Sequence, residues 1–247
     1  MISVIIPTCD EAAELPATLA AVRAQEQPHE ILVVDAGSTD ATAAIARAAD
    51  AAVIASPQRQ RAAQMNLGAR AARGNAFLFL HADTRVAAGA LGQIERALAD
   101  PRVVGGGFAR RYDSPSLFLR LTCAVAEART RFCGWFLGDQ AIFVRRTIFE
   151  ELGGFRERDS FEDLDFARRM SRLGRVVTLR PAVISAARRF IGGAMRTTWR
   201  DLTLTMRYVT EHRHPASARG THPAGPAHSS VPAGSPPTAP AESLCSK

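Results

Sequence analysis

Residues 31–40 read ILVVDAGSTD, an apolar run followed by an aspartate and a turn sequence. Two other segments of the first half have the same form, ISVIIPTCDE at 2–11 and FLFLHADT at 77–84. Short apolar runs bounded by polar turn residues are typical of buried strands. Each predicted strand therefore ends in a cluster of acids and hydroxyl groups, and we expect Pro7 to end the first of them.

Helical patterns separate these strands. The first helix carries Leu15, Leu19 and Val22 on one face. The other elements predicted in this half are helices over 39–49, 58–72 and 88–99 and a strand at 52–54. The alternation predicts an α/β fold, with a Rossmann-type, mostly parallel sheet that has helices on both faces.

The second half is less regular. Its predicted elements are an extended Gly-rich segment at 103–111, a helix at 117–132, a strand at 140–144, helices at 146–152 and 161–173, a strand at 176–179 and a helix at 196–210. We interpret the apolar stretch 117–137 as a core helix, with lipid contact or a homodimer as the alternatives. Residues 211–247 are predicted to be a disordered tail, because they are rich in proline and lack apolar residues.

The basic residues exclude whole mechanisms. Lys247 is the only lysine among 31 Lys and Arg residues. A P-loop needs a lysine on the phosphates and a Schiff-base enzyme needs a lysine amine, so both classes are excluded. The net charge of +7 suits phosphate-rich ligands or anionic lipid headgroups, although a solvated basic surface explains it equally.

No run of about 18 apolar residues is present, and the chain begins directly with a strand, so we expect neither a membrane span nor an export signal. Four scattered cysteines, Cys9, Cys123, Cys133 and Cys245, lack C-x-x-C spacing. This favours reduced thiols and a cytoplasmic protein over disulfides or structural zinc.

The acids at the three strand ends can face one pocket, because ligands of open α/β sheets bind beyond the carboxyl ends of the strands. A single such acid is more often a turn former, but three on one edge favour a binding site. Asp83 is placed to hold Mg²⁺ or Mn²⁺, ions that need few protein carboxylates when substrate phosphate completes their shell. His81 is either a second ligand or a packing residue.

A second acidic segment, SFEDLDF, spans residues 160–166. Ser160 and Asp163 fit a capping box, and Glu162 suits the positive first turn of a helix. Alternatively, one carboxylate acts as a general base toward an acceptor hydroxyl. The residues alone do not decide between these readings.

Together, the motifs resemble the family-two inverting glycosyltransferases of the GT-A fold, over residues 2 to about 200. The resemblance is carried by SVIIPT at 3–8 with Glu11, by VVDAGSTD at 33–40 and by Glu162-Asp163. Residues 61–69, RAAQMNLGA, also resemble a segment of a bacterial subgroup called selenodomain-associated transferases. The resemblance implies transfer of a sugar from a nucleotide diphosphate donor, with a UDP-sugar favoured, to an acceptor hydroxyl.

The resemblance also implies roles for individual residues. Asp163 is the expected base, with Glu162 beside it, and Asp83 is the expected metal ligand, at the position of the family's D-x-D motif. Asp139 lies in a loop similar to the acceptor-side loop, and the expected donor-binding residues are Pro7, Glu11, Asp35, Ser38, Arg61, Asn66 and Ala82. For Arg61, an exposed arginine at a helix start is the alternative.

The processive members of the family carry Q-x-x-R-W, which this sequence lacks, so transfer of a single sugar is expected. Arg188 and Arg189 lie where that motif would come and are expected on the leaving diphosphate. Residues 1–100 would form the nucleotide-sugar-binding half of one domain and residues 101–210 the acceptor-binding and catalytic half.

Three other functions are alternatives. A sugar-1-phosphate nucleotidyltransferase needs a Gly-rich basic loop after the first strand, and residues 7–11, PTCDE, are not such a loop. A dehydrogenase needs G-x-G-x-x-G at the start of a helix, and Gly105-Gly106-Gly107 does not fit that motif. A non-catalytic nucleotide-sugar-binding protein stays open. No nucleic acid partner is expected, because basic and aromatic residues are not interleaved. The acceptor, whether a lipid or a small molecule, and a peripheral contact with a membrane also stay open.

Overall fold

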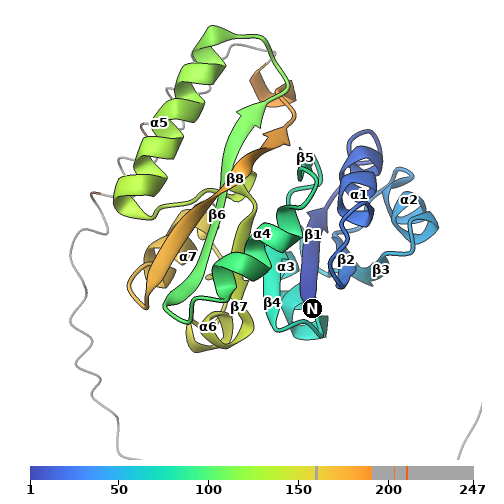
Figure 1. The fold of residues 1–247 in the computed structure, drawn as a ribbon. Helices are drawn as coiled ribbons and strands as arrows, with labels where there is room; N and C mark the ends of the chain where they lie inside the picture. Colours follow the sequence, from blue (N-terminus) through green and yellow to red (C-terminus); the bar gives the residue numbers. More distant parts are fainter. Residues whose placement is uncertain (159–160, 191–202, 204–209, 211–247) are drawn as a thin grey trace, which may run out of the picture.

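The computed structural model describes residues 1–158 and 161–190 and two isolated positions, 203 and 210. The predicted helix at 196–210, apart from those two positions, and the predicted tail at 211–247 lie outside the described residues. One eight-stranded sheet organises the described chain, in the order β3-β2-β1-β4-β7-β6-β8-β5 (Figure 1).

The first half of the chain builds a parallel block. β1 (Ile2–Thr8) pairs in parallel with β2 (His29–Asp35) on one side and β4 (Ala76–Phe79) on the other, and β2 pairs with β3 (Ala52–Ala55). Their carboxyl ends thus lie at the same edge of the sheet. The α/β prediction is confirmed.

The second half continues the sheet with mixed directions. β7 (Ile142–Arg145) is antiparallel to both β4 and β6 (Val103–Tyr112). β8 (Arg175–Ser185) is parallel to β6, and the two-residue β5 (Thr84–Arg85) is antiparallel to β8. Residues from both predicted halves therefore share one continuous sheet.

Helices cover both faces of the sheet, as predicted. One core cluster joins β1 to α1 (Leu15–Arg23), α2 (Thr42–Ala48) and α4 (Ala90–Leu98). The other joins the sheet to α3 (Arg61–Ala71), α6 (Arg146–Glu151) and α7 (Glu162–Met170). Successive β1 residues are buried in opposite clusters, which is the pattern of a strand covered on both sides.

The prediction that Pro7 ends the first strand is wrong. β1 continues through Pro7 to Thr8, pairing with β2. The Ile5 carbonyl accepts from Leu80 N–H on the β4 side, and the ladder with β4 stops at Ile5. Backbone groups two residues apart point to the same side of a strand. The N–H that proline lacks would therefore point past the end of the β4 ladder, where no strand needs it.

α5 (Leu117–Cys133) is not the core helix that we predicted. It lies over β6 and β8, at one end of the molecule (Figure 1). Leu117, Leu121 and Phe132 are 75%, 62% and 81% exposed, whereas Leu119 and Ala126 are buried. The apolar residues lie on more than one side of the helix, so only part of them can face the strands.

α2 starts later than predicted, at Thr42. The residues expected to begin it form a loop contact instead, since Thr39 N–H and hydroxyl both donate to Asp10 Oδ1, at 2.7 and 3.1 Å. This contact links the turns that follow β1 and β2. The predicted end of α6 is confirmed, because Gly153 and Gly154 both have positive φ.

Within the described residues, no helix is long and apolar enough to cross a bilayer.

Candidate active site

The turns after β1 and β2 hold one another at the carboxyl edge of the sheet. Asp10 N–H donates to Ser38 Oγ at 2.9 Å, and Ser38 N–H donates to Asp35 Oδ2 at 3.0 Å. The Ser38 hydroxyl also donates to Asp35. Thr8, the last residue of β1, donates its hydroxyl to Asp35 Oδ1 at 3.1 Å. The buried Asp35 carboxylate is thus fixed by three hydrogen-bond donor groups, next to the half-buried Pro7 of the same strand pair.

A second group joins three predicted site residues from distant parts of the chain. Arg188, in the 3-10 turn η2 (Arg188–Phe190), contacts Glu11 through Nη2, and the same nitrogen lies 3.7 Å from Asp83 Oδ2. The Asp83 side chain is 24% exposed, so it is partly accessible to a ligand. Arg188 is therefore placed where a negative diphosphate would also be attracted.

A bound cation is compatible with Asp83, but it would need ligands from the substrate. The part of the chain that the structure describes contains no group of three or more His, Cys, Asp or Glu side chains arranged to hold a metal ion. Mg²⁺ commonly takes one or two carboxylates and fills its shell with water and phosphate oxygens. The donor set around Asp83 fits that mode and does not fit a metal cage made of protein alone.

Asp163 lies at the start of α7 and points across to the 3-10 turn η1 (Gly138–Gln140). Its Oδ2 accepts from Gly138 N–H, and its Oδ1 accepts from Leu164 N–H at 2.6 Å. The N-cap residue of α7 is Phe161, which has positive φ and makes no side-chain cap. Ser160 lies outside the described residues. The predicted capping box, which needs Ser160, therefore lies outside the described residues, and the described partners of Asp163 are the N–H groups of Gly138 and Leu164.

Burial raises the pKa of Asp163 to about 6, and the negative Glu162 beside it acts in the same direction. The Gly138 N–H and Arg61 oppose this shift. Glu162 is itself buried and forms an ion pair with Arg61 Nη1 at 3.2 Å. A carboxylate with a pKa near neutrality is suited to accept a proton from a hydroxyl group.

Gly138 is required for this arrangement. A Cβ at this position would lie 2.3 Å from His81 Nε2 and 3.1 Å from Asp163 Oδ2. His81 therefore packs against the turn that binds Asp163, and both side chains line a small cavity with Arg61. The sequence had offered His81 as either a ligand or a packing residue, and the described contacts agree with packing.

Asp139, the next residue, is buried and accepts hydrogen bonds from Arg110 and, at 3.0 Å, from the Tyr112 hydroxyl. Arg110 is also almost fully buried, and the Asp139 charge raises its pKa against the opposing effect of burial, so it stays protonated. Sequence reasoning missed Arg110 and Tyr112, because nothing local links them to a residue 27 or more positions away.

Two predicted donor-binding residues, Asn66 and Ala82, have described contacts with buried parts of the protein, and the side chain of one predicted diphosphate residue, Arg189, cannot be located. The Asn66 side-chain amide is engaged at both ends, with Phe155 O at 2.8 Å and Phe155 N–H at 2.9 Å. Ala82 is buried in the core, and its carbonyl accepts from the Thr18 hydroxyl at 2.7 Å. The side chain of Arg189 lies outside what the structure describes.

Comparison with known proteins assigns the family. Residues 3–164 match the model of glycosyl transferase family 2, about two thirds of the chain. The chain belongs to this family. An uncharacterized protein of Mycobacterium tuberculosis, MT1568, is 30% identical and matches 69% of this chain over 61% of its own length. Whether the chain belongs to the selenodomain-associated subgroup stays a prediction.

Solved structures confirm the GT-A fold of this glycosyl transferase family 2 chain. The mannosyltransferase PcManGT of Pyrobaculum calidifontis, solved with GDP-Man and Mn²⁺, aligns with a TM-score of 0.61 and 26% identity over 75% of this chain and 56% of its own. TarS residues 1–349 of S. aureus align with a TM-score of 0.61 and 18% identity over 75% and 60%. This chain thus spans about three fifths of the length of these proteins.

Proposed function

We propose that this glycosyl transferase family 2 chain moves a single sugar from a nucleotide diphosphate sugar to an acceptor hydroxyl, with inversion at the anomeric carbon. The observation that carries the proposal is the common location of Asp35, Asp83 and Asp163. Asp35 is the last residue of β2, and Asp83 lies shortly after the end of β4, at the same edge of the parallel sheet. Asp163 and His81, which lies two residues before Asp83, both pack around Gly138. The absence of Q-x-x-R-W from the sequence supports single transfer.

In the proposed reaction, the acceptor oxygen forms a bond to the anomeric carbon as the bond to the diphosphate oxygen breaks. The acceptor proton passes to Asp163 Oδ2 or Oδ1, and the electron pair leaves with the nucleoside diphosphate. Arg188 would stabilise the charge of that diphosphate. Mg²⁺ or Mn²⁺, held by Asp83 and phosphate oxygens, would supply further charge stabilisation.

The donor side of the proposal assigns the nucleoside to Asp35 and Ser38, with Pro7 and Glu11 beside them. UDP-sugars are favoured, and GDP-sugars are the first alternative, because the 26% identical mannosyltransferase was solved with GDP-Man and Mn²⁺. The three described free cysteines support a reducing compartment, such as the cytoplasm. Residues 1–100 and 101–210 would act as the donor and acceptor halves.

Nucleotide binding tests the proposal and the metal ligand together. With UDP at about 100 times its Kd, in the presence of Mn²⁺, we expect a stabilisation of about 2.7 kcal/mol, or roughly 5–10 °C in Tm. Asp83→Asn should lose the part of this shift that requires Mn²⁺. Differential scanning fluorimetry with UDP and GDP, with and without Mn²⁺, measures it.

The matched control is Asp50→Asn, which makes the same chemical change at an exposed turn before β3, where positive φ tolerates Asn. This variant should keep the metal-dependent shift. A shift of wild-type size in Asp83→Asn would remove Asp83 from the metal site. Release of free nucleotide from a donor sugar would distinguish a transferase from a non-catalytic binding protein.

The raised pKa of Asp163 predicts how activity depends on pH. Because the base must be ionised, kcat/KM should increase about tenfold per pH unit below pH 6 and level off above it. For folding the sign is opposite, since a carboxyl whose folded pKa exceeds its unfolded value contributes stability that is lost as pH rises through about 6. A pH profile of nucleotide release that is flat between pH 5 and 7 would contradict the assignment.

A further inference from the structure

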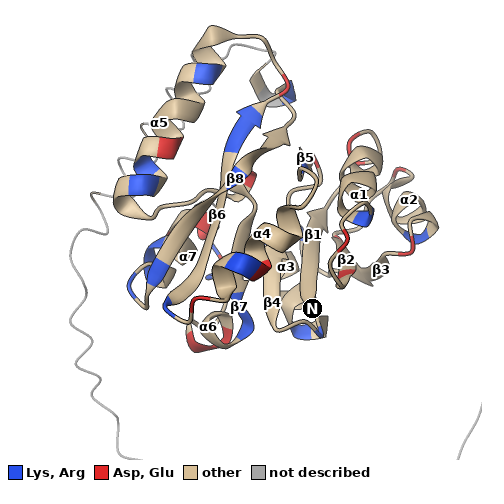
Figure 2. Cartoon of the chain, in the orientation of Figure 1, with Lys and Arg blue, Asp and Glu red and all other residues tan. Residues whose placement is uncertain are grey.

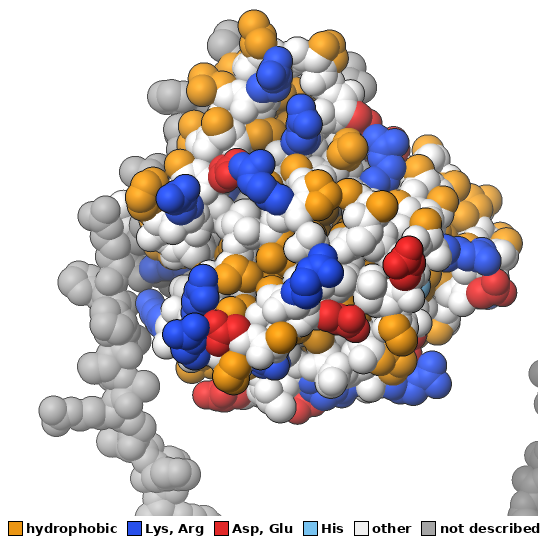
Figure 3. All heavy atoms as spheres, viewed as in Figure 1, with side chains coloured by type: hydrophobic (Ala, Val, Ile, Leu, Met, Phe, Trp, Pro, Cys, Tyr) orange, Lys and Arg blue, Asp and Glu red, His pale blue; other side chains and the backbone are white. Residues whose placement is uncertain are grey.

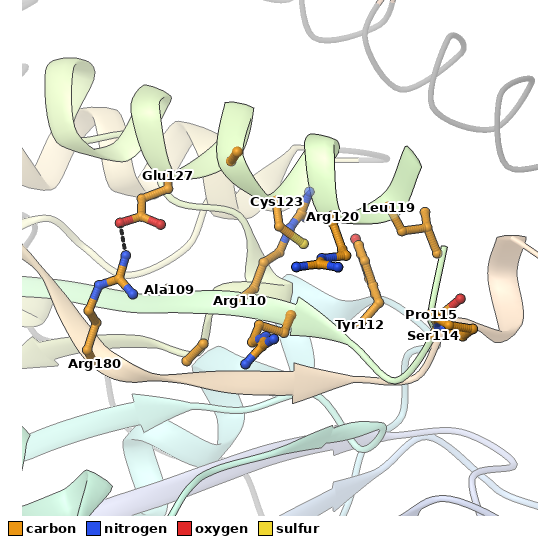
Figure 4. Close-up of a pocket in the computed structure, with 13 residues that line it drawn as sticks. Ala109, Arg110, Tyr112, Ser114, Pro115, Leu119, Arg120, Cys123, Glu127 and Arg180 are labelled. Atoms are coloured by element: carbon orange, nitrogen blue, oxygen red, sulfur yellow. Dashed lines mark hydrogen bonds and ion pairs between the residues drawn. The ribbon is translucent and has the colours of Figure 1, made fainter. Parts of the chain in front are cut away.

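A cavity of about 530 Å³ lies between α5 and the strands β6 and β8 (Figure 4). Its volume falls within the range of roughly 300–1,000 Å³ that is usual for small-molecule sites. Figure 4 shows Arg110, Arg120 and Tyr112 between the helix and the sheet, with Cys123 on α5 beside Arg110. None of the proposed donor-binding residues lines this cavity.

The lining is strongly basic. It contains four arginines and one acid, Glu127, which forms an ion pair with Arg180 (Figure 4). Arg110 is held by Asp139 below the cavity. Arg111 and Arg120 form no ion pair within the described residues. Figure 2 shows basic segments on α5 and on the end of β6, among others spread over the molecule. Arg111 and Arg120 therefore carry positive charge at the cavity lining that no described carboxylate neutralises.

The cavity is close to the proposed base through a short chain of contacts. Arg110 in its wall binds Asp139, and the preceding residue, Gly138, donates its N–H to Asp163. The turn η1 therefore contacts both the cavity wall and the base. A molecule that is anchored among the arginines and reacts at Asp163 would have to follow this turn, whose residues are buried.

We propose that this cavity binds the phosphate group of the sugar acceptor, so that the acceptor is a phosphorylated hydroxyl compound. This inference rests on the proposed function. Phosphate is favoured over a single carboxylate, because its three oxygens can accept from several guanidinium forks at once. The phosphate is an anchor and does not react, and the hydroxyl loses its proton to Asp163 as described above.

The phosphate could belong to a soluble compound or to a lipid headgroup. The outer face of α5 carries the exposed apolar residues Leu117, Leu121, Val125 and Phe132. Figure 3 shows apolar side chains interspersed with basic ones over this end of the molecule. A phosphorylated alkyl chain would be able to use that surface, whereas a soluble phosphate would not.

The test is calorimetric titration of the full chain with inorganic phosphate and with decyl phosphate, with UDP and Mg²⁺ present to fill the donor site. We expect Arg111→Gln/Arg120→Gln to weaken phosphate binding at least tenfold. The control Arg47→Gln/Arg70→Gln removes the same charge from exposed positions on α2 and α3 and should bind as the wild type does.

Equal affinity for the two phosphates would indicate a soluble acceptor, whereas tighter binding of decyl phosphate would indicate a lipid. Either result supports the proposal that the cavity binds the acceptor phosphate. The proposal is overturned if the wild type binds neither probe, if Arg111→Gln/Arg120→Gln binds both normally, or if the control loses as much affinity. Binding of UDP alone is measured in all variants. Its absence from the wild type would refute the transferase function, while a normal UDP affinity with no phosphate binding would refute only the cavity.

Discussion

Asp163→Asn should reduce the rate of sugar transfer from the nucleotide-sugar donor by about 10²–10⁴-fold, while the affinity for UDP stays within about twofold of the wild type. The range is that found for loss of a positioned general base. Asn cannot take the proton, but its side-chain oxygen can still accept from Gly138 N–H, so the turn η1 should keep its place. Release of nucleoside diphosphate from the donor identified by binding is the measurement.

Two further observations separate a chemical role from a structural one. Because the pKa of Asp163 is raised in the folded chain, ionised Asp163 lowers the free energy of unfolding at neutral pH. Asp163→Asn should therefore be at least as stable as the wild type. Asp50→Asn serves again as the control and should retain full activity. A normal transfer rate in Asp163→Asn would assign the base elsewhere, with Glu162 the nearest carboxylate.

Asp139→Ala should lower the free energy of unfolding by about 3–5 kcal/mol, which is the usual cost of removing one partner of a buried ion pair. The Arg110 side chain is only 8% exposed, so without Asp139 its charge is buried with no carboxylate beside it. The Tyr112 hydroxyl also loses its hydrogen bond to Asp139. Equilibrium unfolding in urea, followed by circular dichroism, gives the difference.

Asp100→Ala is the comparison for this experiment. Asp100 forms ion pairs with Arg102 and Arg175, whose side chains are 79% and 60% exposed. Pairs of that kind contribute little to stability, so this variant should unfold near the wild-type midpoint. If both variants unfolded alike, the Arg110 to Asp139 contact would be no more than a surface interaction.

The sequence could predict the parts of the fold and site that depend on neighbours in the chain. Asp35 and Ser38 are three residues apart in one turn, so the motif itself brings them together. β1, β2 and β4 are buried on both faces, so their sequences are nearly continuous apolar runs, which are typical of strands in a helix-covered parallel sheet.

The remaining features depend on contacts that no local pattern encodes. β8 is much longer than predicted because it is mixed in composition, RVVTLRPAVIS, and is defined by its pairing with β6. The exposed side of α5 could not be told from its buried side, because apolar residues occur on both. The hydrogen bonds between Asn66 and Phe155 join residues 89 apart, and no local pattern predicts them.

The antiparallel β7 has a consequence for recombination between related enzymes. It pairs with β4 on one side and β6 on the other, so the two halves have no free boundary between them. A fragment cut after residue 100 would expose the edge of β4, whose four residues are all buried, as an aggregation-prone template. A chimera that takes residues 101–210 from a related protein must therefore include a β7 whose side chains pack against those of the original β4. Without that fit, the two parts would not form one sheet.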